Sequence, residues 1–182
     1  PDVLPLEWSG SGRGDYRESP LELAGEPADF RYTGYKIHEG GVSMACGLPQ
    51  AHDARETLEI TLRQPGAELT LFYTAFPTAI VRRTVLTNTG DKPLRLNKLM
   101  SSCVDLPGSY TMATFNGGWI AEMRRCDTPV GASKVVNESL TGSSSNRHNP
   151  GFLLYEPGAT EDAGTVYGFN LIYSGNHYAA AQ

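Results

Sequence analysis

Residues 57–76, "TLEITLRQPGAELTLFYTAF", decide the fold, because two apolar runs flank a turn. In the first run, residues 57–63, leucine or isoleucine occupies every second position and polar residues occupy the others. Side chains along a strand point alternately to its two faces, so this run predicts a strand with one buried face. Pro65-Gly66 predicts a turn, and the apolar pattern resumes over residues 69–76. The stretch therefore predicts two successive strands.

Further runs rich in β-branched and aromatic residues follow, with turn residues between them. They are residues 79–88, 94–104, 110–116, 151–156 and 165–174. Gly90-Asp91 predicts a hairpin-like reversal after the first of them. The best helical candidate, "IAEMRR" at residues 120–125, is short and is soon followed by Pro129. We therefore expect an all-β protein, an antiparallel β-sandwich that forms a single domain over residues 1–182.

The composition limits the classes of partner. The chain has 182 residues, 40% of them hydrophobic, and a formal net charge of −5. Nucleic acids and anionic membrane surfaces both attract basic proteins, and this chain is acidic. No apolar run approaches the roughly 20 residues that span a bilayer, and no signal peptide is visible. We expect neither nucleic acid nor a membrane as a partner.

The cysteines and histidines argue against a disulfide scaffold and a metal site. Cys46, Cys103 and Cys126 are widely spaced and odd in number, which predicts buried thiols in a reducing compartment, the cytoplasm. The histidines share no short ligand spacing and no CxxC pair is present, so we expect no metal and no cofactor. The chain begins with Pro1-Asp2 rather than methionine, and we interpret it as a fragment of a longer protein.

The stretch "SSSNRHNPGFLLYE", residues 143–156, raises the question of a catalytic nucleophile. Ser143, Ser144 and Ser145 lie near His148 in sequence, but a serine and its general base are defined by geometry rather than by sequence distance. No GxSxG motif is present either. The alternative, which we favour, is a polar turn whose hydroxyl groups bond to the backbone ahead of a strand.

Two other places are candidates for contact with a sugar. In "GRGDYR", flanking glycines could present the Asp15 carboxylate to a hydroxyl group, with Arg17 nearby, although a turn with an Asp-Arg ion pair explains the same pattern. In "NGGWIAEMRR", Trp119 follows two glycines, so its ring could stack on a sugar, or pack in a core or a subunit interface. The spacing of the aspartates pairs no two of them as glycoside hydrolysis requires.

Four segments, taken in order, carry a family resemblance. They are "GRGDYRESPLEL" (12–23), "AIVRRTVLTNTGDKPLRLNKLMSSCVDLP" (79–107), "GGWIAEM" (117–123) and "SLTGSSSNRHNPGFLLYEPGATEDAGTVYGFNLIYSGNH" (139–177). Within the last of them, "GSSSNRHNPGF" and "EDAGTVYGFNLIYSGN" are the most specific. Together they resemble the N-terminal β-sandwich domain of glycoside hydrolase family 36, the bacterial α-galactosidases. The resemblance implies a supersandwich-like fold that is an incomplete part of a larger domain.

The resemblance also implies a division of labour in the parent enzyme. Such a parent hydrolyses terminal α-galactosyl residues of oligosaccharides with retention, and its two catalytic aspartates lie in a (β/α)8 barrel, which needs about 250 residues of its own. This chain is then a non-catalytic domain with no catalytic residue, inactive alone. In tetrameric members a loop of this domain reaches the active site of a neighbouring subunit, which implies a homo-oligomer that acts on α-galactoside oligosaccharides.

The segment "GDYR" matches that loop, so Asp15, with Arg17 beside it, is a candidate substrate contact, and Trp119 is a third. Two alternatives stay open: a free-standing carbohydrate-binding module and a purely structural interaction domain. Galactose binding by the chain alone would favour the first. Unchanged kinetics of Asp15→Ala in the full-length enzyme would favour the second.

Overall fold

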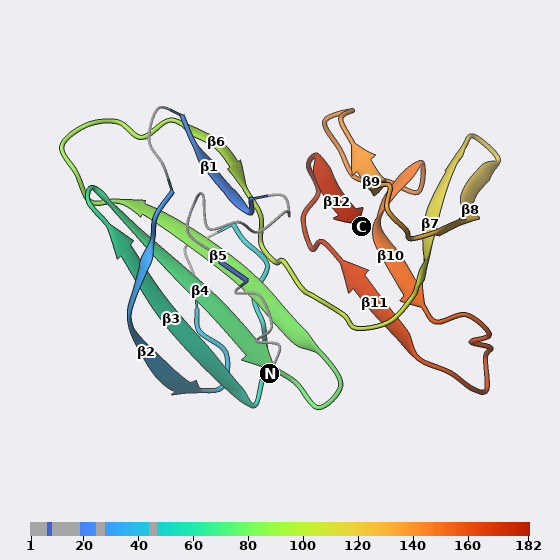
Figure 1. Ribbon diagram of the computed structural model, residues 1–182, viewed down its shortest axis with the longest axis horizontal. Coiled ribbons are helices and arrows are strands. Elements are labelled where there is room, and N and C mark those ends of the chain that lie inside the picture. Colours follow the sequence, from blue (N-terminus) through green and yellow to red (C-terminus); the bar gives the residue numbers. More distant parts are fainter. Residues whose placement is uncertain (1–6, 9–18, 25–27, 44–46) are drawn as a thin grey trace. The chain divides into compact units, whose positions relative to one another are not determined.

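A computed structural model describes residues 7–8, 19–24, 28–43 and 47–182. All elements of regular secondary structure among these residues are β-strands, and all paired strands run antiparallel. The expectation of an all-β antiparallel fold is therefore confirmed. The chain divides into two compact units, Pro1–Leu106 (unit 1) and Pro107–Gln182 (unit 2), and each has sheets of its own (Figure 1).

Unit 1 is built on a four-stranded sheet in the order β2-β3-β4-β5, with β1 paired to β6. The strand bounds are β1 Leu21–Leu23, β2 Arg31–Glu39, β3 Glu56–Gln64, β4 Ala67–Ala75, β5 Ile80–Asn88 and β6 Leu96–Leu99. The prediction of a hairpin-like reversal at Gly90-Asp91 was wrong, because β6 pairs with β1 and not with β5. A local turn signal does not determine which distant strand supplies the hydrogen-bonding partners.

The two strands predicted within residues 57–76 are confirmed as β3 and β4, but the prediction that residues 57–63 bury one face only was wrong, because Thr57 on the other face is 0% exposed and pairs with the buried Thr74. Leu62 lies opposite Leu69 and Ile60 lies opposite Leu71 across the two strands. Together with leucines from β1, these side chains form the core of the unit, whose buried members are Leu21, Leu23, Leu62, Leu69 and Leu71. Burial of such aliphatic groups is the main favourable contribution to folding.

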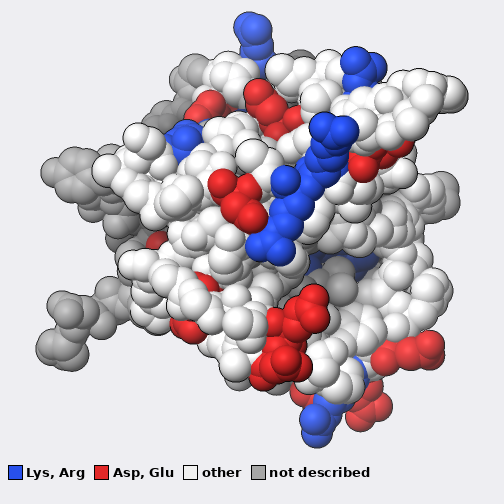
Figure 2. Space-filling view, turned by 90° about the vertical axis from the view of Figure 1, so that its right-hand side faces the viewer, with Lys and Arg blue, Asp and Glu red and all other residues white. Residues whose placement is uncertain are grey.

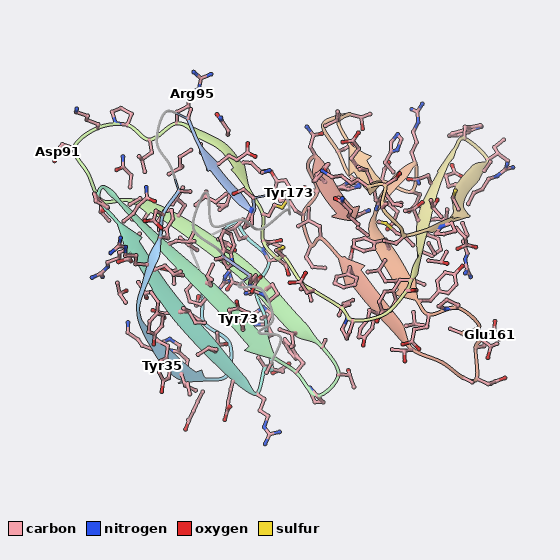
Figure 3. The ribbon with its side chains drawn as sticks, viewed as in Figure 1. Tyr35, Tyr73, Asp91, Arg95, Glu161 and Tyr173 are labelled. Carbon is pink, nitrogen blue, oxygen red and sulfur yellow. The ribbon has the colours of Figure 1, made fainter. Side chains whose placement is uncertain are left out.

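The sheet of unit 1 also binds the segment at Glu7. The Glu7 carboxylate accepts hydrogen bonds from the Tyr73 hydroxyl of β4, the Arg82 guanidinium of β5 and the backbone N–H of Cys103. Burial, followed by the hydrogen bond to Glu7, raises the pKa of Tyr73 to about 12. Figure 3 labels Tyr73 and also Tyr35 of β2, which is 62% exposed. A partly buried carboxylate with three donors fixes Glu7 on the sheet.

Unit 2 contains a four-stranded sheet in the order β11-β10-β7-β8 and the pair β12-β9. The strand bounds are β7 Thr111–Gly118, β8 Ala121–Pro129, β9 Val135–Ser139, β10 His148–Tyr155, β11 Val166–Asn170 and β12 His177–Ala181. The expectation that residues 120–125 are too short a candidate for a helix agrees with the structure, because all but the first of them belong to β8 and Arg125 lies opposite Phe115 of β7. Pairing with β7 satisfies the backbone in an extended conformation, which local propensity does not report.

The charged side chains do not separate by sign on the face that Figure 2 shows. Lys and Arg lie among Asp and Glu there, and most of the visible atoms belong to other residues. A face of this kind lacks the single-sign field that attracts polyanions. Within the described residues, no helix has the length and apolar character needed to cross a bilayer.

Candidate functional site

The three predicted substrate contacts differ in what the structure says of them. Asp15 and Arg17 lie outside the described residues. Trp119 lies at the tip of the hairpin formed by β7 and β8, where it is 89% exposed and its neighbour Ile120 is 84% exposed. Trp119 therefore does not pack in the core of unit 2. The two other interpretations, a sugar platform and an interface anchor, are compatible with this position.

The backbone of the hairpin tip is tight and strained. Gly118 pairs with Ala121, so Trp119 and Ile120 form a two-residue turn. Ile120 has φ 64°, a left-handed conformation that is a true outlier for a β-branched residue. A Cβ at Gly117 would lie 2.0 Å from the Ala121 carbonyl oxygen, so this position requires glycine. Gly117, the first glycine of "NGGW", thus allows the close approach of the two strands next to the turn at Trp119, whereas a Cβ at Gly118 would meet no atom within 4 Å.

The hairpin is held near its turn by the polar loop, residues 140–147 between β9 and β10. The N–H of Gly117 donates to the Arg147 carbonyl at 3.0 Å, and the N–H of Met123 donates to the Asn146 carbonyl at 3.2 Å. The side-chain amide of Asn149 adds a contact at 3.2 Å to the Met123 sulfur. The position of Trp119 therefore depends on a loop that lies more than 20 residues further along the chain.

The polar loop is in turn bound to the β11–β12 segment, residues 171–176, in which Figure 3 labels Tyr173. The N–H of Gly142 donates to the Asn176 side-chain oxygen at 2.7 Å. The N–H of Ser144 donates to the Ser174 carbonyl at 3.0 Å, and its hydroxyl donates to the Gly175 carbonyl at 2.8 Å. The two stretches that carry the most specific family resemblance therefore lie against each other.

The serines of the polar loop do not form a catalytic pair with His148. Ser145 and His148 exchange backbone hydrogen bonds at 3.2 and 3.1 Å, and the Ser145 hydroxyl accepts the N–H of Arg147 at 3.2 Å. The imidazole closest to a serine hydroxyl is that of His177, whose Nδ1 lies 3.3 Å from Ser144 Oγ. The hydroxyl groups bond to the backbone, which agrees with the interpretation as a polar turn ahead of β10.

His177 is the group in this cluster that no sequence motif indicates. It is 4% exposed, and its neighbours Asn137 and Ser139 on β9 are each 2% exposed. Burial, and then the nearby His148, lower the pKa of His177, while Glu138 acts in the opposite direction. A neutral imidazole is therefore the form that this position favours. Its partner Ser144 is 33 residues away in sequence, so no local motif reveals the pair.

Among the described residues, no group of three or more His, Cys, Asp or Glu side chains lies close enough together to hold a metal ion. Asp127, on β8, is instead bound to Arg125 at 2.8 Å. What the cluster presents is an exposed aromatic side chain on a hairpin that is held near its turn by backbone hydrogen bonds. A ring in such a position can pack on a sugar or on a protein partner.

The comparison with protein families identifies the chain. The model of the glycosyl hydrolase family 36 N-terminal domain matches residues 1–182, and the chain therefore belongs to that family. The bifunctional alpha-galactosidase/sucrose kinase AgaSK of Mediterraneibacter gnavus is 34% identical over 193 aligned residues, which cover 100% of this chain and 20% of that protein. Probable alpha-galactosidase G of Emericella nidulans is 35% identical over 189 residues, which cover 97% and 26%.

Solved structures agree with this membership. The GH36 alpha-galactosidase AgaB from Geobacillus stearothermophilus superposes with a TM-score of 0.85 at 32% identity, over 97% of this chain and 26% of that one. The alpha-galactosidase from Lactobacillus brevis superposes with a TM-score of 0.86 at 32% identity, over 96% and 25%. The chain thus spans 20% to 26% of the length of these relatives.

Proposed function

We propose that this chain is the non-catalytic N-terminal domain of a cytoplasmic, retaining α-galactosidase that removes terminal α-galactosyl residues from oligosaccharides. The observation that carries the proposal is the family match over all 182 residues, which includes both compact units. AgaA variants from Geobacillus stearothermophilus have been solved with stachyose and with raffinose, which supports this substrate class. The two carboxylates of retention then belong to the rest of the parent polypeptide.

Within the parent, the domain supports assembly of a homo-oligomer and shapes the entrance of the substrate site. Asp15, Arg17 and Trp119 are its proposed substrate contacts. The Trp119 ring is exposed on a hairpin that is hydrogen-bonded to the polar loop through the backbone N–H groups of Gly117 and Met123. A ring held in place before the sugar arrives loses little conformational entropy on binding. Contacts remote from the scissile bond can still accelerate the reaction by orienting the substrate.

The reaction is tested on the full-length protein with raffinose, followed by proton NMR of the released galactose. Retention predicts that the α anomer appears first and that the β anomer grows in by mutarotation. Residues 1–182 alone should release no galactose under the same conditions. Release of the β anomer first, or hydrolysis by the isolated chain, would contradict the proposal.

The substrate contacts are tested by Asp15→Ala and Trp119→Ala in the full-length protein, with Tyr35→Ala as the matched control for loss of an exposed aromatic residue. We expect each test variant to raise KM for raffinose about tenfold, which corresponds to about 1.4 kcal/mol, with a smaller change in kcat. Tyr35→Ala, on β2 of unit 1, should leave KM unchanged. Wild-type kinetics in both test variants would favour the purely structural role.

A free-standing carbohydrate-binding module is the second candidate, because a solvent-exposed Trp119 is a group that such modules use. Calorimetric titration of residues 1–182 with galactose and with raffinose distinguishes the two. The α-galactosidase proposal predicts no heat of binding at millimolar sugar. Binding at millimolar or lower concentration that disappears in Trp119→Ala would favour the module.

A further inference from the structure

The buried polar cluster of unit 2, formed by Asn137, Ser139 and His177, contains one imidazole nitrogen without a hydrogen-bonding partner among the described residues. His177, the first residue of β12, lies opposite Ser139 of β9 and is 4% exposed. Its Nδ1 is 3.3 Å from Ser144 Oγ in the polar loop. Its Nε2 is buried, and no hydrogen-bonding partner for it is present among the described residues. Buried polar atoms are usually paired, so the state of this nitrogen needs a physical explanation.

The neighbours of Ser144 determine which nitrogen of His177 carries the proton. The Ser144 hydroxyl lies 2.8 Å from the Gly175 carbonyl oxygen and 3.2 Å from the Tyr173 carbonyl oxygen. Carbonyls only accept, so the single hydroxyl hydrogen goes to one of them. The contact with His177 then requires Nδ1–H to donate to Ser144 Oγ. Nε2 is left as a bare lone pair, which is the less costly group to bury without a partner.

Protonation of His177 would change this balance. It would leave the Nδ1–H contact with Ser144 Oγ in place and add a charged N–H at Nε2, where burial removes the solvent that stabilises the charge. The effect of protonation therefore comes from this buried charge and not from loss of the Ser144 contact. The titratable groups that act on the ring are His148 of β10, which opposes a positive charge, and Glu138 of β9, which favours it. The polar loop carries Arg147, and the β11–β12 segment carries Tyr173. The one carboxylate, Glu138, is therefore outweighed by burial and by His148, and the pKa of His177 is lowered.

We propose that His177 is an acid-sensitive latch: its neutral ring holds the polar loop against the β11–β12 segment, and its protonation releases the loop. In the latched state this ring contact accompanies the hydrogen bonds from Gly142 and Ser144 to Asn176, Ser174 and Gly175. In acid, the ring takes a second proton. The polar loop then leaves the segment, and the hairpin loses the hydrogen bonds at Gly117 and Met123, next to the turn that carries Trp119.

The direction of the pH effect follows from the lowered pKa. Above pH 6.5 the ring is neutral in both the folded and the unfolded chain, so the latch holds. As the pH falls from 6.5 through the folded-state pKa, the unfolded or released form binds more protons, and the latched state loses stability. Lowering the pH therefore weakens the latch within the range where histidine titrates.

The test uses hydrogen–deuterium exchange of the full-length protein at pH 7.5 and 5.0, corrected for the intrinsic pH dependence of exchange. The peptide that covers the polar loop reports the amides of Gly142 and Ser144. We expect its protection in the wild type to fall at least fivefold at pH 5.0. His177→Gln, which cannot titrate, should reduce this fall to less than twofold. His52→Gln removes an exposed histidine of unit 1 and should behave as the wild type.

Wild-type protection that is equal at the two pH values would overturn the proposal, and so would a wild-type response in His177→Gln. Should that variant fail to fold, exchange at the imidazole C2 position of the unmodified protein, read by mass spectrometry, reports the protonation of His177 directly. A pKa for His177 below 6.5, with slow C2 exchange, supports the latch. A value of 6.5 or above overturns it, because a ring that is already charged near neutral pH cannot hold the loop in its neutral form.

Discussion

Among the described residues, most buried side chains of unit 1 are apolar and include five leucines, whereas more than half of those of unit 2 are polar and include Asn137, Ser139 and His177. The leucines come from neighbouring strands and need only exclude water from one another. Each of these polar groups instead needs a particular partner, such as the Asn149 carbonyl that accepts the Asn137 amide at 2.9 Å. The difference is one of proportion, because unit 1 also buries the hydrogen-bonded pair Thr57 and Thr74 and unit 2 also buries Met112: non-directional packing contributes more in unit 1 and specific pairing more in unit 2.

The two kinds of stabilisation respond differently to change. Removal of methyl groups from a leucine core costs a transfer term and a cavity term, which depend on volume. Removal of one partner from a polar cluster leaves the other partner buried and unpaired, so its cost depends on chemistry rather than on volume. The three substitutions below test this contrast in order of expected size.

The largest effect is expected from Leu69→Ala in the core of unit 1. Leu69 is 0% exposed and lies opposite Leu62, so truncation leaves a cavity that its neighbours cannot fill. We expect a loss of about 3–4 kcal/mol in the free energy of unfolding, measured by urea denaturation. Leu96→Ala, at a position that is 46% exposed, is the control and should cost less than about 1 kcal/mol. Equal losses in the two variants would mean that the leucine cluster does not act as a core.

A smaller effect is expected from Asn137→Leu in unit 2. The substitution keeps the volume nearly constant and removes the donor to the Asn149 carbonyl, which is left without this bond. We expect a loss of about 1–3 kcal/mol, detected as a lower urea midpoint. The matched control is Asn97→Leu on β6, where the side chain is exposed and the change should stay within about 0.5 kcal/mol. A stabilised Asn137→Leu would show that unit 2 is held by volume, as unit 1 is.

The same contrast explains how much of the structure the sequence could predict. The strands at residues 57–76 were predictable because the alternation of leucine with polar residues is local and depends only on the pleat. The hairpin-like reversal at 90–91 failed because strand pairing is decided by distant partners: β6 pairs with β1 and not with β5. The clustering of Ser144 with His177 was not predictable either, since the contact joins residues 33 positions apart.

The candidate site likewise has a part that a local sequence pattern predicts and a part that depends on contacts between distant residues. Trp119 could be selected from sequence because two glycines precede it, and Gly117 is the one that the close approach of the strands requires. The hydrogen bonds that hold this hairpin near its turn are accepted by Asn146 and Arg147, and nothing in the pattern at 116–125 points to them. A local motif therefore identified the presenting side chain, and only the tertiary structure identified what holds it.

The smallest effect, and one of opposite sign, is expected from Ile120→Gly. The hairpins β3–β4 and β7–β8 both turn through two residues, and the second turn residue is Gly66 with φ 78° in unit 1 and Ile120 with φ 64° in unit 2. Glycine removes a left-handed penalty of about 1–2 kcal/mol and adds an unfolded-state entropy cost of about 0.5–1 kcal/mol. Because Ile120 is 84% exposed, little burial is lost, and urea denaturation should show a gain of about 0.5–1 kcal/mol.

Val136→Gly on β9 is the control for this gain, because Val136 is 40% exposed and is absent from the residues with positive φ, so glycine should destabilise the chain there. A loss of stability in Ile120→Gly would mean that the isoleucine side chain makes a stabilising contact that outweighs its strained backbone. A gain would mean that unit 2 keeps a less stable turn than unit 1 has in Pro65-Gly66. The retained side chain then has a use outside folding, and a KM for raffinose that rises in Ile120→Gly as it does in Trp119→Ala would place that use at the substrate entrance.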